Sequence, residues 1–447
     1  MRIDRVTATP GSSAFFFDDQ AAITAGTDRD GVAYTGDPQT PGYEQVREPG
    51  ESLLVQIETS DGRVLRGDCA AVQYSGAGDR DPLFRAAEYA PRVEGAVAEA
   101  LVGRDPTAFA DNAAVVESLR PDGERLHTAV RYGVSQALLA AAAAARGTTR
   151  TRVLADALGT EPASEPVPVF GQSGDDRRQG AEKMLLKGVS VLPHGLFNNA
   201  QKIGRDGERL VEYLSWLTER ADELGPDGYD PRIHVDVYGT LGELFGPPYD
   251  RREVVDYFRE LARAAAPYPL QVEGPVDAGS HEAQIHAMAE LRDGLDEAGV
   301  AVDIVADEWC DTRADVERFV DAGAADVVQV KTPDLGSVAE SGRAVRYCGE
   351  TDVRAYLGGT CNETTVSARA CAHIGLATDA AQLLAKPGMG FDEGYAVVTN
   401  EMRATLARHN NNAERRHDSA EHRYDDTERR HDSAEHRYDN AEHTTDR

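Results

Sequence analysis

The second part of the chain alternates short apolar runs with longer amphipathic segments in a regular rhythm. The runs have the length of buried strands, and apolar residues in the segments between them recur at helical spacing. Eight such units over roughly 240 residues match the size of a (β/α)8 TIM barrel, an α/β fold. The eight runs are Val167–Gln172, Met184–Gly195, Arg232–Gly239, Leu270–Pro275, Val302–Trp309, Asp326–Asp334, Val353–Asn362 and Leu383–Gly388.

The segments between these runs predict the helices that cover a barrel. A doubly wound open sheet is the alternative, but it would not usually need eight such units. In addition, no Gly-rich turn follows the first run, as a dinucleotide-binding sheet would require. The clearest helical segments are Glu208–Leu224, Glu253–Ala265, His281–Gly299 and Arg313–Gly323.

The first part of the chain has a different order of strand-like and helical segments. Strand-like runs at Ser52–Thr59 and Val64–Tyr74 precede helical segments, an order that is typical of a separate α+β domain. The stretch Gly159–Phe170, rich in Pro, Ser and Glu, separates the two parts of the chain. We therefore expect an N-terminal α+β domain at residues 1–160 and a barrel domain at residues 161–408.

The composition changes abruptly beyond Arg408. The string ERRHDSAEHRYD at Glu414–Asp425 recurs unchanged at Glu428–Asp439, and the region is rich in histidine. A His-rich tract can bind metal, but this one has almost no large aliphatic residue with which to bury a core. We expect residues 409–447 to form a disordered or loosely helical tail outside the fold and the active site.

The chain is strongly acidic, with 77 Asp+Glu against 47 Lys+Arg and a formal net charge of −30. This balance argues against a nucleic-acid partner, because phosphate binding needs a dense basic surface. Five of the basic residues are lysines and the rest are arginines. The composition favours a hydrated surface adapted to high salt, although a GC-rich genome would also replace Lys by Arg.

Targeting and disulfide signals are weak. The amino terminus has no basic stretch followed by an apolar one, and the longest apolar run, Ala137–Ala145, is too short to span a bilayer. Five cysteines without a CxxC pair favour neither a disulfide framework nor a zinc knuckle. We expect a cytoplasmic protein with free thiols and no membrane partner.

In three consecutive strand-like runs a carboxylate closes the apolar stretch: Asp236 in RIHVD, Glu273 in LQVE and Asp307 in DIVAD. Their separations, 273 − 236 = 37 and 307 − 273 = 34, each correspond to about one βα unit, so the three should converge at the barrel mouth. Carboxylates that close together repel unless a hard dication neutralises them, and Mg²⁺ fits best because no Cys or His lies at these strand ends. Alternatively, each acid caps a helix or pairs with an arginine.

Two further strand ends carry groups suited to proton transfer. Lys331 follows an apolar run, and burial near a dication would lower the pKa of its ammonium group and make it a general base. A lysine paired with one of the metal carboxylates, or a Schiff-base lysine, is the alternative. His194 ends the second run and would approach from the opposite wall, although a lone histidine is often structural. A metal triad with a lysine base predicts proton abstraction next to a carboxylate.

Several local strings together resemble the enolase superfamily and, within it, the methylaspartate ammonia-lyase family. The resemblance extends from the first domain to about Arg408 and does not include the repetitive tail. The strings are QYSGAGDRDPLF (Gln73–Phe84), LPHGLFNN (Leu192–Asn199), HVDVYGTLG (His234–Gly242), VEGPVDAGS (Val272–Ser280), ADEWC (Ala306–Cys310), QVKTPDLG (Gln329–Gly336), LGGTCNET (Leu357–Thr364) and AKPGMGFDEG (Ala385–Gly394).

The resemblance implies an enolase-type barrel whose N-terminal domain acts as a lid, and elimination of ammonia from (2S,3S)-3-methylaspartate to give mesaconate. It implies Mg²⁺ held by the three carboxylates, a monovalent activator, K⁺, and a homodimer. Lys331 would take the C3 proton, and His194 would be the acid/base on the opposite face, able to serve the 3R epimer. The substrate-binding positions that it implies, besides His194, are Gln73, Gln172, Gln329, Thr360 and Cys361.

Two other functional hypotheses are compatible with the sequence. A different reaction of the same superfamily, such as dehydration or epimerisation, would use the same metal chemistry. It would normally need an acid/base pair suited to sugar acids or a second lysine two residues before Lys331, where Gln329 stands. A Schiff-base aldolase or a non-catalytic barrel with a salt-bridged core would need no metal.

Overall fold

The structure is a computed structural model that describes residues 1–78, 80–174, 176–246 and 251–409. The expected tail at residues 409–447 lies outside these ranges except for His409. None of the helices in the described part of the chain is both long and apolar enough to cross a membrane.

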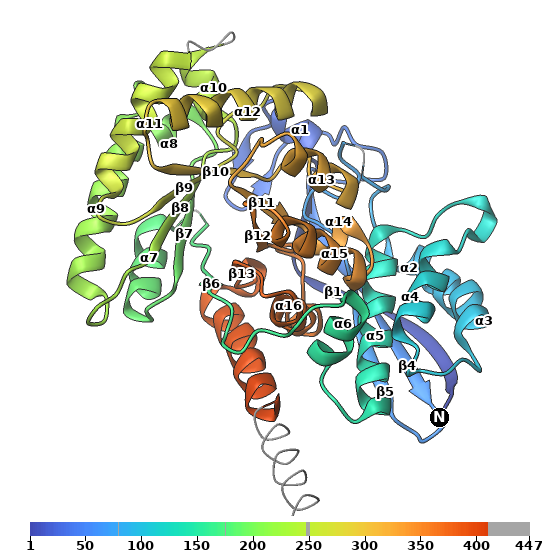
Figure 1. Ribbon diagram of the computed structural model, residues 1–447. Helices are drawn as coiled ribbons and strands as arrows, with labels where there is room; N and C mark the ends of the chain where they lie inside the picture. The colour runs from blue at the N-terminus through green and yellow to red at the C-terminus, as the bar shows by residue number, and fades with distance from the viewer. Residues whose placement is uncertain (79, 175, 247–250, 410–447) are drawn as a thin grey trace, which may run out of the picture. The chain divides into compact units, whose positions relative to one another are not determined.

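Eight parallel strands close into a barrel, and this confirms the predicted (β/α)8 architecture (Figure 1). The strands follow one another around the barrel in chain order, from β6 to β13 and back to β6. All eight therefore present their carboxyl ends at the same mouth. Their bounds are β6 Val169–Phe170, β7 Val191–Leu196, β8 Arg232–Asp236, β9 Leu270–Glu273, β10 Val302–Ala306, β11 Val327–Val330, β12 Arg354–Leu357 and β13 Gln382–Leu384.

The longer helices of this part lie outside the barrel, as the amphipathic pattern predicted (Figure 1). They are α7 Arg177–Leu186, α9 Glu208–Leu224, α11 Arg251–Ala265, α12 His281–Glu297, α13 Arg313–Asp321, α15 Val338–Gly349 and α16 Thr365–Thr378. By itself, the segment of residues 391–409 is also helical. Shorter helices follow several strands: α8 Ala200–Ile203, α10 Thr240–Phe245, α14 Thr332–Leu335 and the 3-10 turn η3 Pro387–Met389.

One strand prediction was wrong in part. The run Met184–Gly195 was assigned to a single strand, but its first residues close helix α7, and the strand begins at Val191. Met184 and Leu185 are buried on a helix face instead. Periodicity does not separate a short apolar helical turn from a buried strand, so the boundary could not be read from the sequence.

The N-terminal part contains an antiparallel sheet with β4 between β1 and β5. Strand β1, with 16 residues, was not predicted from the sequence. The elements are β1 Ile3–Asp18, α1 Gln20–Thr24, β2 Arg29–Asp30, β3 Ala33–Tyr34, β4 Arg47–Thr59, β5 Val64–Ala70, α2 Ala86–Arg92, the π-helical η1 Val93–Val97, α3 Ala98–Leu101, α4 Phe109–Ser118, the 3-10 turn η2 Pro121–Gly123, α5 Thr128–Arg146 and α6 Arg150–Leu158.

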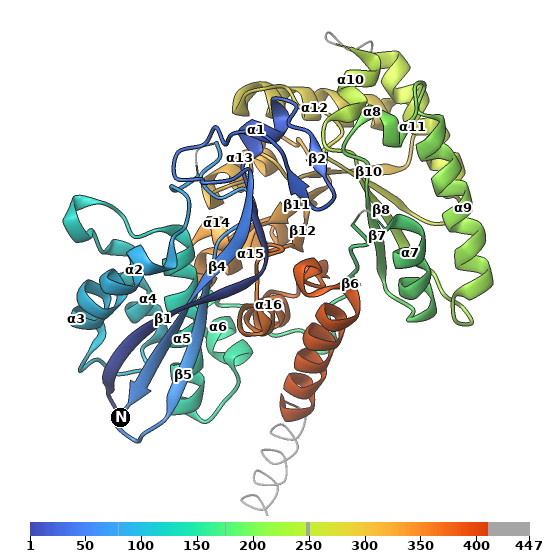
Figure 2. The ribbon, with the colours of Figure 1, turned by 180° about the vertical axis from the view of Figure 1, so that it is seen from behind.

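Helix α5 is the central element of this part, and every residue from Ala129 to Ala143 is buried. It packs directly on β5, where a Cβ on Gly67 would lie 1.9 Å from the carbonyl oxygen of Gly133. Glycine is needed at this contact because the two backbones touch. Figures 1 and 2 show α5 and α6 beside α15 and α16 of the barrel, with which they are in contact. The first part of the chain thus packs against the barrel helices α15 and α16.

Candidate active site

A cavity of about 100 Å³ lies where the barrel strands end, and all ten residues predicted to form the site line it. Gln73 comes from the N-terminal part, in the loop after β5, and the other nine come from the ends of barrel strands. The ten residues are Gln73, Gln172, His194, Asp236, Glu273, Asp307, Gln329, Lys331, Thr360 and Cys361.

The three carboxylates extend from adjacent strands, as predicted. Asp236 ends β8 opposite Glu273, which ends β9, and Asp307 follows the last residue of β10. All three are buried, and burial followed by the charge of Asp307 raises the pKa of both Asp236 and Glu273 well above the ordinary carboxyl range. Burial also raises the pKa of Asp307 to about 6, against the opposing charge of Lys331. Buried like charges with raised pKa values, on oxygen ligands, are a donor set that a hard dication would stabilise.

Two buried histidines adjoin these acids. The Nε2 atom of His194 lies 3.6 Å from Asp236 Oδ2 and 3.7 Å from Glu273 Oε2. His234 Nε2 is closer, 2.6 Å from Glu273 Oε2, and its Nδ1 lies 3.0 Å from Gln271 Oε1. Burial lowers the pKa of His234 to about 3 and that of His194 well below its ordinary value, so both rings are neutral at pH 7.

His194 was expected to approach these acids, whereas His234 was not predicted to lie beside them. His194, His234 and Glu273 offer ligand atoms within 4.8 Å of one another. His234 could have been found from the sequence, because it lies two residues before Asp236 and alternate strand residues share a face. Both ring nitrogens of His234 already have hydrogen-bond partners, Gln271 and Glu273.

Lys331 follows β11 and points at the same acids. Its Nζ lies 2.7 Å from Asp307 Oδ1 and 3.7 Å from Glu308 Oε1, and its side chain is 13 % exposed. Burial lowers its pKa, but the charges of Asp307 and Glu308 outweigh that effect, so the net shift is upward. The predicted lowering of the lysine pKa assumed a bound dication beside Asp307 and stays a prediction; without the cation, the ion pair with Asp307 raises it.

His194 and Lys331 face the cavity from opposite walls. Strands β7 and β11 are four positions apart in an eight-stranded closed barrel, whichever way the strands are counted. His194 has φ 63°, a left-handed conformation that is uncommon for a residue with a side chain. Such backbone strain persists where surrounding structure holds a functional side chain in place.

Amide groups reach the cavity from both parts of the chain. Gln73 Nε2 donates to Asp18 Oδ2 at 2.6 Å, and Arg47 holds that carboxylate through two nitrogens. In the barrel, Gln329 Nε2 donates to Glu273 Oε1 at 3.3 Å and to the hydroxyl of Tyr356. These contacts fix the orientation of two amides that can hydrogen-bond a small polar ligand.

Several lining residues were not predicted. Arg80, from the N-terminal part, is 8 % exposed and ion-pairs Asp311 at 2.6 Å and Asp334 at 3.0 Å. Its place inside the string Gln73–Phe84, which carries the family resemblance, is the sequence signal that points to it. The other unpredicted lining residues are Val72, Tyr74, Tyr238, Tyr356, Gly359, Leu384 and Pro387.

The closed parallel barrel with an additional N-terminal part also occurs in a solved enzyme structure. Muconate cycloisomerase from Pseudomonas fluorescens shares the fold, with a TM-score of 0.54 at 16% sequence identity over 84% of this chain and 84% of that chain. The chain belongs to the methylaspartate ammonia-lyase family. The N-terminal model of that family matches residues 1–159, and its C-terminal model matches residues 161–411.

Similar proteins cover nearly the whole chain. A methylaspartate ammonia-lyase of Haloarcula marismortui is 67% identical over 91% of this chain and 97% of its own length. A Mg complex of β-methylaspartase from Clostridium tetanomorphum superposes with a TM-score of 0.88 at 47% identity, over 92% of this chain and 100% of that one. The Citrobacter amalonaticus enzyme, solved with (2S,3S)-3-methylaspartic acid, gives 0.88 at 49% identity, over 91% of this chain and 99% of that chain.

Proposed function

We propose that this protein eliminates ammonia from (2S,3S)-3-methylaspartate to give mesaconate. The observation that carries the proposal is the meeting of three carboxylates, Lys331 and His194 in one small cavity at the barrel mouth. Membership of the methylaspartate ammonia-lyase family supports it, as does the substrate named for the Citrobacter amalonaticus structure.

The two proton-transfer residues act from opposite faces of the substrate. Lys331 takes the C3 proton of the 3S substrate, and His194 serves as the acid/base on the other face, where the 3R epimer presents its proton. The neutral state of buried His194 suits it to accept a proton. Both side chains are held in place, the lysine by Asp307 and the histidine by its strand.

Asp236, Glu273 and Asp307 hold Mg²⁺ in this proposal. When bound, the cation supplies positive charge that stabilises the substrate carboxylate as negative charge develops beside C3. The fit rests on the buried carboxylates with raised pKa values, and the Mg complex of the Clostridium tetanomorphum enzyme agrees with it. A monovalent cation, K⁺, is the further activator that we infer from the family.

Polar side chains around the cavity bind the rest of the amino dicarboxylate. Gln329 lies in β11, Gln172 follows β6, and Thr360 and Cys361 follow β12, whereas Gln73 comes from residues 1–160. We infer that this first domain caps the barrel of residues 161–408 and excludes water from the reaction. We also expect a homodimer in the cytoplasm, which size-exclusion chromatography with light scattering and cell fractionation would test.

The direct test is a mesaconate assay on the purified full chain with Mg²⁺ and K⁺. Mesaconate is conjugated, so its formation from 3-methylaspartate raises the ultraviolet absorbance. Absence of product at saturating salt and Mg²⁺ would show the proposal to be wrong. A covalent substrate adduct at Lys331, trapped by borohydride, would instead indicate Schiff-base chemistry.

A further inference from the structure

The segment that carries Lys331 continues directly into an interface with the N-terminal part of the chain. Lys331 is the N-cap residue of the short helix α14, which ends at Leu335, and Ser337 is the N-cap residue of α15. The carbonyl of Lys331 accepts the backbone N–H of Asp334 at 3.0 Å. Whatever fixes the start of α15 therefore also restrains the backbone of Lys331, six residues earlier.

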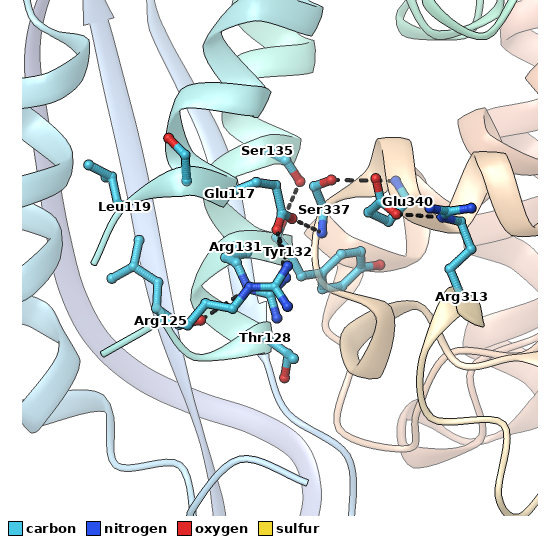
Figure 3. Close-up of polar contacts among 12 residues, drawn as sticks. Glu117, Leu119, Arg125, Thr128, Arg131, Tyr132, Ser135, Arg313, Ser337 and Glu340 are labelled. Atoms are coloured by element: carbon cyan, nitrogen blue, oxygen red, sulfur yellow. Dashed lines mark hydrogen bonds and ion pairs between the residues drawn. The ribbon is translucent and has the colours of Figure 1, made fainter. Parts of the chain in front are cut away.

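The start of α15 has the sequence of a capping box, Ser337 followed three residues later by Glu340. In such a box the glutamate side chain reaches back to the backbone N–H of the N-cap residue. Here Ser337 Oγ accepts from the N–H of Glu340 at 3.4 Å, but the carboxylate of Glu340 pairs with Arg313 at 2.8 Å instead (Figure 3). The N–H of Ser337 is thus left for another partner.

Glu117 of helix α4 is that partner. Its Oε1 accepts the N–H of Ser337 at 3.0 Å, and the next N–H, of Val338, donates to Ser135 Oγ of helix α5 at 2.9 Å (Figure 3). Two residues of the N-terminal part therefore satisfy the first two donors of a barrel helix. A carboxylate is also the charge that a helix N-terminus favours.

The position of Glu117 is itself fixed. Arg131 Nη1 lies 2.6 Å from Glu117 Oε2, and its Nε donates to the carbonyl of Leu126 at 3.0 Å. The Arg131 side chain is 4 % exposed, so it cannot swing away. Gly336, at φ +90°, passes so close that a Cβ there would lie 2.5 Å from Arg131 Nη1. The chain between Lys331 and α15 thus packs tightly against this ion pair.

We propose that Glu117 is a positioning residue for Lys331. It does not line the cavity, and it acts by holding the start of α15, and with it the segment from Lys331 to Val338, against the N-terminal part of the chain. The inference deepens the proposed function, because it rests on Lys331 as the group that takes the C3 proton. It assigns to the first domain a role in placing the base, in addition to that of a cap.

The test compares Glu117→Leu, Glu117→Gln and Arg125→Gln in the full-length protein with Mg²⁺ and K⁺. Leucine removes both the acceptor and the charge, whereas glutamine keeps an oxygen for the Ser337 N–H. Arg125→Gln is the matched control, since Arg125 pairs with the same carboxylate at 2.9 Å but is 53 % exposed, and exposed pairs contribute little. Circular dichroism and thermal unfolding give the folded fraction of each variant.

The readouts are kcat per folded molecule, KM, and the isotope effect with substrate deuterated at C3. For Glu117→Leu we expect kcat to fall about 10-fold or more, because small displacements of a reacting group are costly, with KM within about twofold. The isotope effect should rise as proton abstraction becomes slower, and Glu117→Gln should lie between Glu117→Leu and the unaltered protein. A merely structural loss lowers the number of active molecules and leaves the isotope effect unchanged.

Two outcomes would overturn the inference. One is a kcat for Glu117→Leu that matches the Arg125→Gln control, and the other is a fall in kcat with no change in the isotope effect. Failure of the proposed function is distinguished by the unaltered protein, which would then form no mesaconate. In that case the inference would also be wrong.

Discussion

The Nζ atom of Lys331 lies 2.7 Å from Oδ1 of Asp307, so the proposed base is an ion-pair partner of a proposed metal ligand. This single contact joins the two halves of the proposed chemistry, since the strand ends of β10 and β11 present them side by side. It also explains why a lysine with a largely buried side chain is stable in the protein, because an unpaired buried ammonium group would be costly.

The carboxylate site leads to a prediction about metal dependence. EDTA should stop mesaconate formation, and added Mg²⁺ should restore it. Asp307→Asn should lower the affinity for Mg²⁺ at least about 10-fold, because loss of even an indirect contact to a metal has an effect of that size. Calorimetric titration of Mg²⁺ into the variant measures the affinity without relying on turnover. Full activity in EDTA would refute the three-carboxylate assignment.

The opposed positions of Lys331 and His194 predict a split between epimers. Lys331→Ala should lower turnover of the 3S substrate by about 10²- to 10⁴-fold, the usual contribution of a general base. His194→Ala should reduce the 3R reaction more than the 3S reaction. Separate assays with the two epimers check this, with thermal unfolding as the control for folding. Equal losses for both epimers in both variants would speak against two separate bases.

His127 predicts a pH dependence of stability away from the cavity. Its Nδ1 accepts the N–H of Ala129 at the start of α5, and burial lowers its pKa from 6.5 to about 4, so the folded protein favours the neutral ring. A depressed histidine pKa contributes stability above pH 6.5 that is lost as pH falls toward 4, a difference of about 3 kcal/mol at most.

The measurement for His127 is the free energy of unfolding from denaturant titrations at pH 7 and pH 5 in the same salt. His127→Asn keeps a capping oxygen but does not titrate. Its stability should fall less between the two pH values than that of the unaltered protein. The same loss in both would mean that other groups cause the acid sensitivity.

Lys386 forms a fully buried ion pair with Glu363, 2.6 Å apart and 0% exposed on both sides. Tyr132 of the N-terminal part donates to the same carboxylate. Lys386→Met should lower the free energy of unfolding by about 3–5 kcal/mol, because it leaves a buried charge without its partner. The double change Lys386→Met with Glu363→Gln should recover part of that loss. Denaturant titrations of the unaltered protein, Lys386→Met, Glu363→Gln and the double variant measure this, and additive losses in the double variant would contradict the coupling.

The net charge of −30 predicts a general effect of salt on stability, distinct from the proposed activation by K⁺. The Debye length falls from about 30 Å at 0.01 M to about 3 Å at 1 M, so any monovalent salt should raise the unfolding temperature by screening repulsion. Activity should respond to KCl more than to choline chloride at equal ionic strength. Equal activation by both salts would argue against a specific K⁺ effect.

Much of the architecture could be predicted because its determinants are local. Each barrel strand is a short apolar run, and the carboxyl ends of parallel strands must meet, so Asp236, Glu273, Asp307 and Lys331 could be placed together from spacing alone. Helix α9, Glu208–Leu224, has the predicted bounds, because its apolar residues recur at the helical period.

Other features depend on contacts between distant segments. The sequence placed Lys331 at a strand end, but the ion pair with Asp307 that raises its pKa follows from the distance between two side chains. Ser337 and Glu340 have the sequence of a capping box, but the Glu340 carboxylate pairs with Arg313 instead. The N–H of Ser337 donates to Glu117, which lies 220 residues earlier in the chain. The sequence by itself determined the barrel and the residues at its mouth, because periodicity and strand direction are local properties. Only the tertiary structure decided their partners and charge states, because these depend on burial and on groups far apart in the chain.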